Sequence, residues 1–263
     1  MSTGVDTGTA SPRATATEWL GFVRSLVVYR RPGRQRALRR LYAPFVGEDD
    51  LVFDVGAHVG DRALAFASLG ARVIALEPQP RFARGLRRTV GSHPLVEVRE
   101  EAVGARPGRE RLAISRRTPS VSTMSESWRA DVSEANPGFR SVRWDAAVEV
   151  PVVTLDQLIE AHGVPRFCKI DVEGYEAEVL AGLSRPVAGL SLEFVAGQLE
   201  TAAACVRRLN TLGAYRYNVI LGEGRDFRFG DWCDADSVVD WLRGGADGTS
   251  SGDVYARLDA PHA

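Results

Sequence analysis

Lysine is nearly absent from this chain, and cysteine and long apolar runs are scarce. Among 263 residues Lys169 is the single lysine, and arginine supplies the other basic side chains. The three cysteines, Cys168, Cys205 and Cys233, are too few and too widely spaced for a zinc motif or a disulfide framework. No stretch reaches the ~20 apolar residues that span a bilayer, and the N-terminal residues lack a basic-then-apolar secretory pattern. We therefore expect a cytoplasmic protein with reduced thiols.

Net charge is also small. A formal charge of −1 gives no general electrostatic reason to expect nucleic acid or an anionic membrane as partner. One stretch departs from this balance, because seven arginines occur without an intervening acid: Arg24, Arg30, Arg31, Arg34, Arg36, Arg39 and Arg40. They are either a solvated face of N-terminal helices or a patch for a phosphorylated substrate or carrier.

Hydrophobic residues make up 44% of the chain and charged residues 25%, which is typical of a globular protein with a sizeable core. Residues 1–17 are small and polar and are predicted to be a disordered leader. Residues 18–48 form a predicted N-terminal helical region, with helices over 17–29 and 35–45. Residues 49–263 are predicted to be one domain.

Strands and helices alternate through this predicted domain. Strands are expected at 51–55, 72–76, 96–99, 109–115, 148–153, 166–170, 190–194, 215–221, 226–229 and 254–258. Helices are expected at 61–69, 80–90, 154–162, from the turn at Gly174 to 183, at 202–212 and at 237–243. This alternation predicts an α/β fold with a doubly wound sheet. Ligands of such sheets bind beyond the carboxyl ends of the strands.

The most informative motif begins with the first of these strands. Asp54 lies near the end of this strand, Gly56 follows it, Gly60 precedes a helix, and Glu77 comes directly after the next strand. An acid after the second strand of a βαβ unit, such as Glu77, accepts hydrogen bonds from ribose hydroxyls. Asp54 stands beside the glycine turn, where it would repel the pyrophosphate of a dinucleotide. It would attract the ammonium of an amino acid, so we expect S-adenosylmethionine as cofactor. The alternative is an ordinary βαβ turn whose glycines serve only packing.

A second charged motif follows the strand at 166–170. Lys169, Asp171 and Glu173 alternate along the chain and precede Gly174. Alternate residues of a strand share one face, so these charges are expected next to the reactive end of a cofactor. Asp54, Glu77, Glu101 and Asp171 all fall at strand ends and would line one crevice.

The ordered set of motifs closely resembles the FkbM family of S-adenosylmethionine-dependent methyltransferases, over residues 50–195. The matching segments are FDVGAHVG at 53–60, ALEP at 75–78, EAVG at 101–104, TLD at 154–156, KIDVEG at 169–174 and SLE at 191–193. The resemblance implies a class I methyltransferase (Rossmann-like) sheet of about seven strands, with a late antiparallel strand. It also implies methyl transfer to oxygen, usually on sugars, polyketides or other specialised metabolites.

The resemblance also implies roles for particular residues. The methionine end of the cofactor is expected on Asp54, Gly56 and Gly60; the ribose on Glu77; the adenine beside Glu101 and Ala102; and the sulfonium and acceptor beside Asp171. Ala57 and His58, which lie in the same glycine turn, are also expected to contact the cofactor. His58 stands where many relatives carry asparagine, so the family assigns it no role. Residues 117–146 match no part of the family and are predicted to form a substrate-side insertion or lid with little regular structure. Trp128 and Trp144 belong to this segment and would either stack on an acceptor or cover the edge of the core.

Two chemical questions stay open at this level. Asp171 is the first candidate for the base that receives the acceptor's proton, and His58 is the second; Asp171 could instead only position the cofactor. A divalent metal held by Asp171, Glu173 and Glu193 would be another way to activate a hydroxyl. We favour a structural role for Glu193, as a partner of Lys169 inside the sheet.

The function predicted from these residues is methyl transfer to a hydroxyl of a small molecule. The alternatives are an RNA methyltransferase, which the near-zero net charge disfavours, and a non-catalytic S-adenosylmethionine-binding partner subunit. The identity of the acceptor and the oligomeric state do not follow from the sequence.

Overall fold

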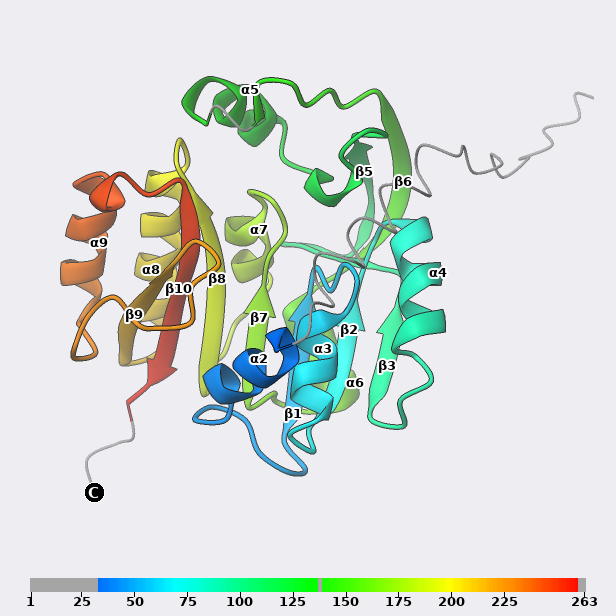
Figure 1. Cartoon of the computed structure of the whole chain (residues 1–263), viewed down its shortest axis with the longest axis horizontal. Coiled ribbons are helices and arrows are strands. Elements are labelled where there is room, and N and C mark those ends of the chain that lie inside the picture. Colours follow the sequence, from blue (N-terminus) through cyan, green and yellow to red (C-terminus); the bar gives the residue numbers. More distant parts are fainter. Residues whose placement is uncertain (1–32, 137–138, 260–263) are drawn as a thin grey trace, which may run out of the picture.

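A seven-stranded sheet forms the centre of the computed structural model, which describes residues 33–136 and 139–259 (Figure 1). The strand order is β3-β2-β1-β7-β8-β10-β9, and the antiparallel pairing of β10 with both of its neighbours makes it the reversed strand. The strands are β1 (Leu51–Val55), β2 (Arg72–Leu76), β3 (Val96–Arg99), β7 (Phe167–Ile170), β8 (Gly189–Val195), β9 (Tyr215–Leu221) and β10 (Ser251–Leu258). The expected class I methyltransferase sheet with its late antiparallel strand is confirmed.

Helices cover both faces of this sheet because its strands are apolar on both sides. One face packs on α2 (Arg34–Tyr42), α3 (Asp61–Ala67) and α4 (Pro80–Thr89). The other packs on α6 (Leu155–His162), α7 (Glu176–Ala181), α8 (Leu199–Leu212) and α9 (Ala235–Arg243). Adjacent residues of β1 divide between the two layers, since Val52 belongs to the first core cluster and Phe53 to the second. Thr154 begins α6 with a capping box that Gln157 completes.

A smaller sheet and a helical segment lie beside the carboxyl ends of the main strands (Figure 1). The strand order of the smaller sheet is β4-β6-β5, with β4 (Ala102–Val103), β5 (Gly108–Ile114) and β6 (Ala146–Val153). Between β5 and β6 the chain forms η1 (Pro119–Val121) and α5 (Glu126–Ala135); a further short 3-10 helix, η3 (Ala246–Gly248), precedes β10. The expectation of little regular structure over 117–146 is therefore wrong in part.

Trp128 explains why that segment is ordered. Its side chain is 0% exposed and packs edge-on against Phe139 and Trp144. Gly174 lies directly against the indole, so close that a Cβ there would meet the Trp128 ring at 2.1 Å. Trp128 therefore joins the segment to the second motif and offers no ring face to an acceptor.

A second correction concerns residues 226–229, which were expected to form a strand. Arg228 donates its N–H to Val219 O, but the next residue is held by a side chain. Asn218 bonds both the N–H and the C=O of Phe229, which replaces the backbone ladder that a strand would need. The segment is consequently irregular.

Several expectations lie outside the described residues. These are the leader, the helix at 17–29, and the side chains of Arg24, Arg30 and Arg31. Of the other basic residues in that stretch, Arg36, Arg39 and Arg40 are exposed on α2, as a solvated helix face requires. Within the described part of the chain, no helix is both long and apolar enough to cross a membrane.

Candidate active site

A cavity of about 250 Å³ opens at the carboxyl ends of the main strands. Its walls come from the turn after β1, the end of β2, the segments after β3 and β7, and the region of β10. The segment between β5 and β6 closes another side through Ser120, Val121, Ser122 and Met124. The fold therefore gathers residues that are up to about 200 positions apart in sequence around one space.

Gly56 brings the two sequence motifs together. It adopts a left-handed conformation with φ 82°, and a Cβ there would lie 1.8 Å from the carbonyl oxygen of Asp171. The N–H groups of Gly56 and Ala57 both donate to Leu76 O at 2.9 Å, which also ties the turn to β2. Only glycine permits this approach, so the turn sets the spacing of the cavity walls.

Asp54 projects from β1 into this space with an unsatisfied oxygen. The residue is 1% exposed, and its Oδ2 has no hydrogen-bond partner in the described chain. Burial raises the pKa of Asp54 to about 6, although the charges of Lys169 and Arg62 oppose the shift. A buried carboxylate with a free acceptor atom suits a cationic donor on a ligand.

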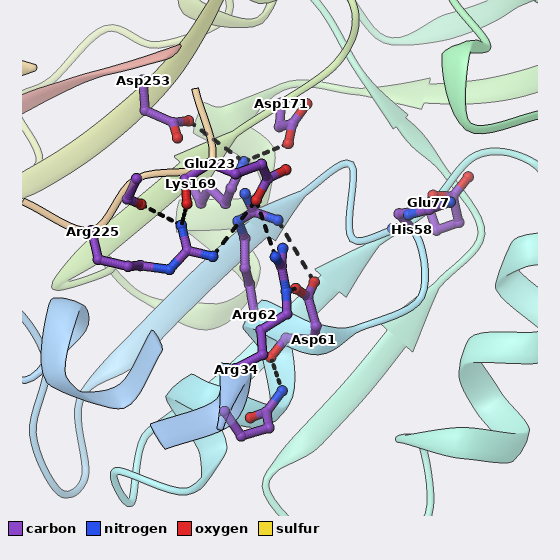
Figure 2. Close-up of polar contacts among 12 residues, drawn as sticks. Arg34, His58, Asp61, Arg62, Glu77, Lys169, Asp171, Glu223, Arg225 and Asp253 are labelled. Carbon is purple, nitrogen blue, oxygen red and sulfur yellow. Dashed lines mark hydrogen bonds and ion pairs between the residues drawn. The ribbon is translucent and has the colours of Figure 1, made fainter. Parts of the chain in front are cut away.

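Glu77 lies with His58, apart from the charged cluster around Lys169 and Arg62 (Figure 2). Its two oxygens accept the N–H groups of His58 and Gln79, each at 2.9 Å, and burial raises its pKa to about 7. His58 reaches this position with a left-handed φ of 50°, and its ring packs on Phe82. Burial lowers the pKa of His58 to about 4, so the imidazole is neutral at pH 7.

The raised pKa of Glu77 predicts a pH-dependent stability. Between its ordinary pKa and about 7 the folded state retains a proton that the unfolded chain has lost, so folding loses stability as pH rises through this window. We expect the wild type to lose about 3 kcal/mol relative to Glu77→Gln between pH 4 and pH 8. Urea unfolding across this range measures the difference.

Glu97→Gln is the matched control for that experiment, because Glu97 is exposed on β3. Its difference from the wild type should stay nearly constant over the same pH range. A flat difference for Glu77→Gln as well would show that the buried carboxyl ionises normally.

The residues expected beside the adenine lie at the cavity, but the last glycine of the first motif does not. Glu101 and Ala102 line the cavity, and Glu101 is held by Arg99 through a 2.6 Å ion pair. Gly60 does not line the cavity. Its φ is 78°, and a Cβ there would lie 2.5 Å from Leu86 Cδ1, so this glycine serves the packing of α3 against α4.

Asp171 and Glu193 are neighbours at the ends of β7 and β8, and Lys169 lies beneath them. Lys169 is 1% exposed; its Nζ donates to Asp171 Oδ2 at 2.7 Å and lies 4.0 Å from Asp253 Oδ1 (Figure 2). Glu193 instead lies beside Asp171, with a carboxylate oxygen within 4.8 Å of one of Asp171. The expected Lys169–Glu193 pair is therefore wrong, because the β7–β8 register sets Lys169 opposite Ser191.

These contacts determine the charge of Asp171. Burial by itself would raise its pKa, but the charges of Lys169 and Arg62 lower the pKa well below the usual range. Asp171 is therefore ionised at neutral pH. In contrast, burial and the charge of Asp171 raise the pKa values of Glu173 and Glu193.

Asp171, Glu173 and Glu193 can each offer an oxygen within 4.8 Å of the others, as a metal site would need. However, Lys169 already neutralises Asp171, and burial together with the charge of Asp171 raises the pKa of Glu193, which favours its protonated form. A dication would have to compete with a buried ammonium 2.7 Å away. The donor set therefore fits a metal poorly, and we derive no metal-dependent step.

Sequence reasoning missed four charged residues in the lining: Asp61, Arg62, Glu223 and Asp253. Asp61 and Arg62 come immediately after the first motif, so their position in the first turn of α3 was the available signal. Asp253 and Glu223 lie far along the chain from both motifs. Only the insertion of β10 beside β8, with Asp253 opposite Glu193, brings them to the site.

Comparison with known proteins identifies the family. The model of the FkbM methyltransferase domain matches residues 54–245. The chain belongs to the FkbM family of S-adenosylmethionine-dependent methyltransferases. The chain is 30% identical to the hexuronic acid methyltransferase AglP of Haloferax volcanii over 166 residues, which are 62% of each protein. The match thus covers less than two thirds of that curated relative.

Solved structures resemble the FkbM chain more weakly. A TehB-like S-adenosylmethionine-dependent methyltransferase of Corynebacterium glutamicum gives a TM-score of 0.48 at 11% identity, over 92% of this chain and 96% of that one. An O-methyltransferase of Bacillus cereus, in complex with S-adenosylhomocysteine, gives 0.44 at 14% identity, over 95% and 94%. The family assignment accordingly depends on the sequence match.

Proposed function

We propose that this enzyme transfers the methyl group of S-adenosylmethionine to a hydroxyl oxygen of a small molecule. The observation that carries the proposal is the buried Oδ2 of Asp54, which has no hydrogen-bond partner among the described residues; Asp54 and Glu77 line the same cavity. A ligand with an ammonium and a vicinal diol would satisfy both carboxylates. S-adenosylmethionine combines these two groups.

The residues of the cavity would divide the cofactor among them. Asp54 would hold the ammonium beside Gly56 and Ala57, and Glu77 would accept the ribose hydroxyls. Phe82 and Ala102 offer apolar surface to the adenine near Glu101. When bound, the cofactor supplies an activated methyl group on a sulfonium.

The protein's part in the reaction is mainly alignment and exclusion of water. Asp171 remains our first candidate to receive the acceptor's proton and His58 the second. Both are weak bases here, since Lys169 stabilises the ionised form of Asp171 and burial lowers the pKa of His58. Such groups accept a proton late, after the oxygen has begun to bond to the methyl carbon.

The acceptor is proposed to be a hydroxylated metabolite such as a sugar or a polyketide. AglP acts on a hexuronic acid, as its name states, which supports a sugar-like acceptor for part of the family. The segment over 117–146 is proposed to act as the substrate-side wall, because Ser120 to Met124 border the cavity.

Calorimetric titration with S-adenosylmethionine tests the proposal. We expect binding to wild type, and about 10- to 100-fold weaker binding to Asp54→Ala and to Glu77→Ala, because each variant removes a charge-assisted hydrogen bond. Glu97→Ala, on exposed β3 surface, should bind as the wild type does. Methyl transfer is then followed as S-adenosylhomocysteine formed with a panel of sugars and polyketides. Absence of binding to the wild type would refute the assignment of the cavity.

A further inference from the structure

Arg62 lines the cavity, and one of its N–H donors has no hydrogen-bond partner within the described residues. It is the second residue of α3, and its side chain is 16% exposed. Its ion pair with Asp61 is long, at 3.6 Å from Nη1 to Asp61 Oδ1. The other oxygen of Asp61 is taken by Arg34 Nε at 2.8 Å. Arg62 Nε has no hydrogen-bond partner in the described parts of the chain.

The other acids around Arg62 already have cations of their own (Figure 2). Lys169 pairs with Asp171 and lies near Asp253. Glu223 contacts Arg34 at 3.1 Å and Arg225 at 3.6 Å. A guanidinium carries five N–H donors in a planar fork that matches a carboxylate. Among the described residues Arg62 thus keeps one N–H donor without a partner, while the surrounding acids keep the guanidinium charged.

The lining as a whole has one positive side chain among many negative ones. Its acids are Asp54, Asp61, Glu77, Glu101, Asp171, Glu173, Glu193, Glu223 and Asp253, and Arg62 is the only Arg or Lys among the described residues that line it. S-adenosylmethionine has the matching inventory, with a sulfonium and an ammonium but a single carboxylate. One anionic group on the ligand meets one guanidinium on the protein.

We propose that Arg62 binds the methionine carboxylate of S-adenosylmethionine, opposite Asp54, which takes the ammonium. The two residues stand on either side of the glycine turn, at the end of β1 and the start of α3, and each lines the cavity. Together they would bind both charged groups of the amino acid. A nucleoside or a neutral thioether without the amino acid carries neither group. This inference depends on the proposed function, because it assigns the same cavity to the same cofactor.

The test compares S-adenosylmethionine with one ligand that lacks only its carboxylate and one that lacks the whole amino-acid chain together with the sulfonium charge. S-adenosylmethionine, decarboxylated S-adenosylmethionine and 5′-methylthioadenosine are titrated by calorimetry into wild type, Arg62→Gln and Arg62→Lys. Wild type should prefer S-adenosylmethionine to its decarboxylated form by about 10- to 100-fold, as one charge-assisted bidentate contact allows. Arg62→Gln should remove that preference, Arg62→Lys should keep part of it, and 5′-methylthioadenosine should bind all three proteins within about threefold.

Arg36→Gln is the matched control, since Arg36 is an exposed arginine on α2 and should retain the full preference. The inference would be overturned if wild type and Arg62→Gln showed the same preference for the carboxylated ligand. It would also be overturned if Arg62→Gln weakened the binding of 5′-methylthioadenosine as much as that of S-adenosylmethionine. If Arg62→Gln does not fold, the wild-type preference and its reduction in Arg62→Lys decide the matter. Wild type that binds none of the three ligands would instead refute the proposed function.

Discussion

Lys169→Met is expected to destabilise the protein by about 3–5 kcal/mol, the range for removing one member of a buried ion pair. Lys169 is 1% exposed and lies among Asp54, Asp171 and Asp253. Burial opposes its charge, yet these acids raise its pKa, so the ammonium is stabilised by its surroundings. Methionine would fill similar volume but leave the carboxylates without their cation. Urea unfolding of both proteins at pH 7 measures the loss.

A second substitution separates the charge effect from packing. In Lys169→Met/Asp171→Asn the closest carboxylate is neutral, so we expect at least half of the lost stability to return. Asp171→Asn alone should cost less than Lys169→Met, because the remaining lysine still faces Asp253. A loss below about 1 kcal/mol for Lys169→Met would mean that the acids do not depend on this lysine.

Gly56→Ala is expected to cost about 2–5 kcal/mol, combining a left-handed backbone with an overpacked contact. The added Cβ would lie 1.8 Å from Asp171 O and 2.9 Å from Asp171 C, both of which are backbone atoms. Relief requires the β1 turn and the end of β7 to separate. We therefore also expect S-adenosylmethionine binding to weaken by at least tenfold, since Asp54 and Asp171 would move apart. Thermal unfolding and calorimetry measure the two effects.

Gly222→Ala is the matched control. Gly222 also lines the cavity and has φ 51°, but a Cβ there would meet no atom within 4 Å. It should cost about 1–2 kcal/mol, the conformational penalty without the clash. Equal losses for the two variants would show that the contact with Asp171 is not what requires glycine at position 56.

The local chemistry of the chain could be predicted from neighbouring residues alone. Apolar strands followed by Asp54 and Glu77 predicted a βαβ unit and a ligand at the strand ends, since both signals involve residues close together in the chain. Thr154 at the start of α6 was predicted for the same reason, because a capping box spans four residues. The ordered motifs predicted the family, which the match over residues 54–245 shows.

Errors arose where a distant segment supplied the partner. Residues 226–229 have a strand-like sequence, but the side chain of Asn218 takes the hydrogen bonds of Phe229. Trp128 was a candidate to stack on an acceptor, but the close approach of Gly174 buries its ring. Neither contact produces a periodic pattern of apolar residues in the sequence, so residue spacing could not predict either one.

The sequence by itself therefore determined the order of strands and helices, the family, and the acids at the ends of β1 and β2, because each depends on contacts within a few residues. Tertiary structure decided which charges meet. Cross-strand register sets Lys169 opposite Ser191 and not Glu193, the reversed β10 brings Asp253 near Lys169, and the segment from β1 to α3 places Asp54 and Arg62 in the lining of one cavity. Electrostatic pairing depends on distance in space, and that distance exists only after the sheet has formed.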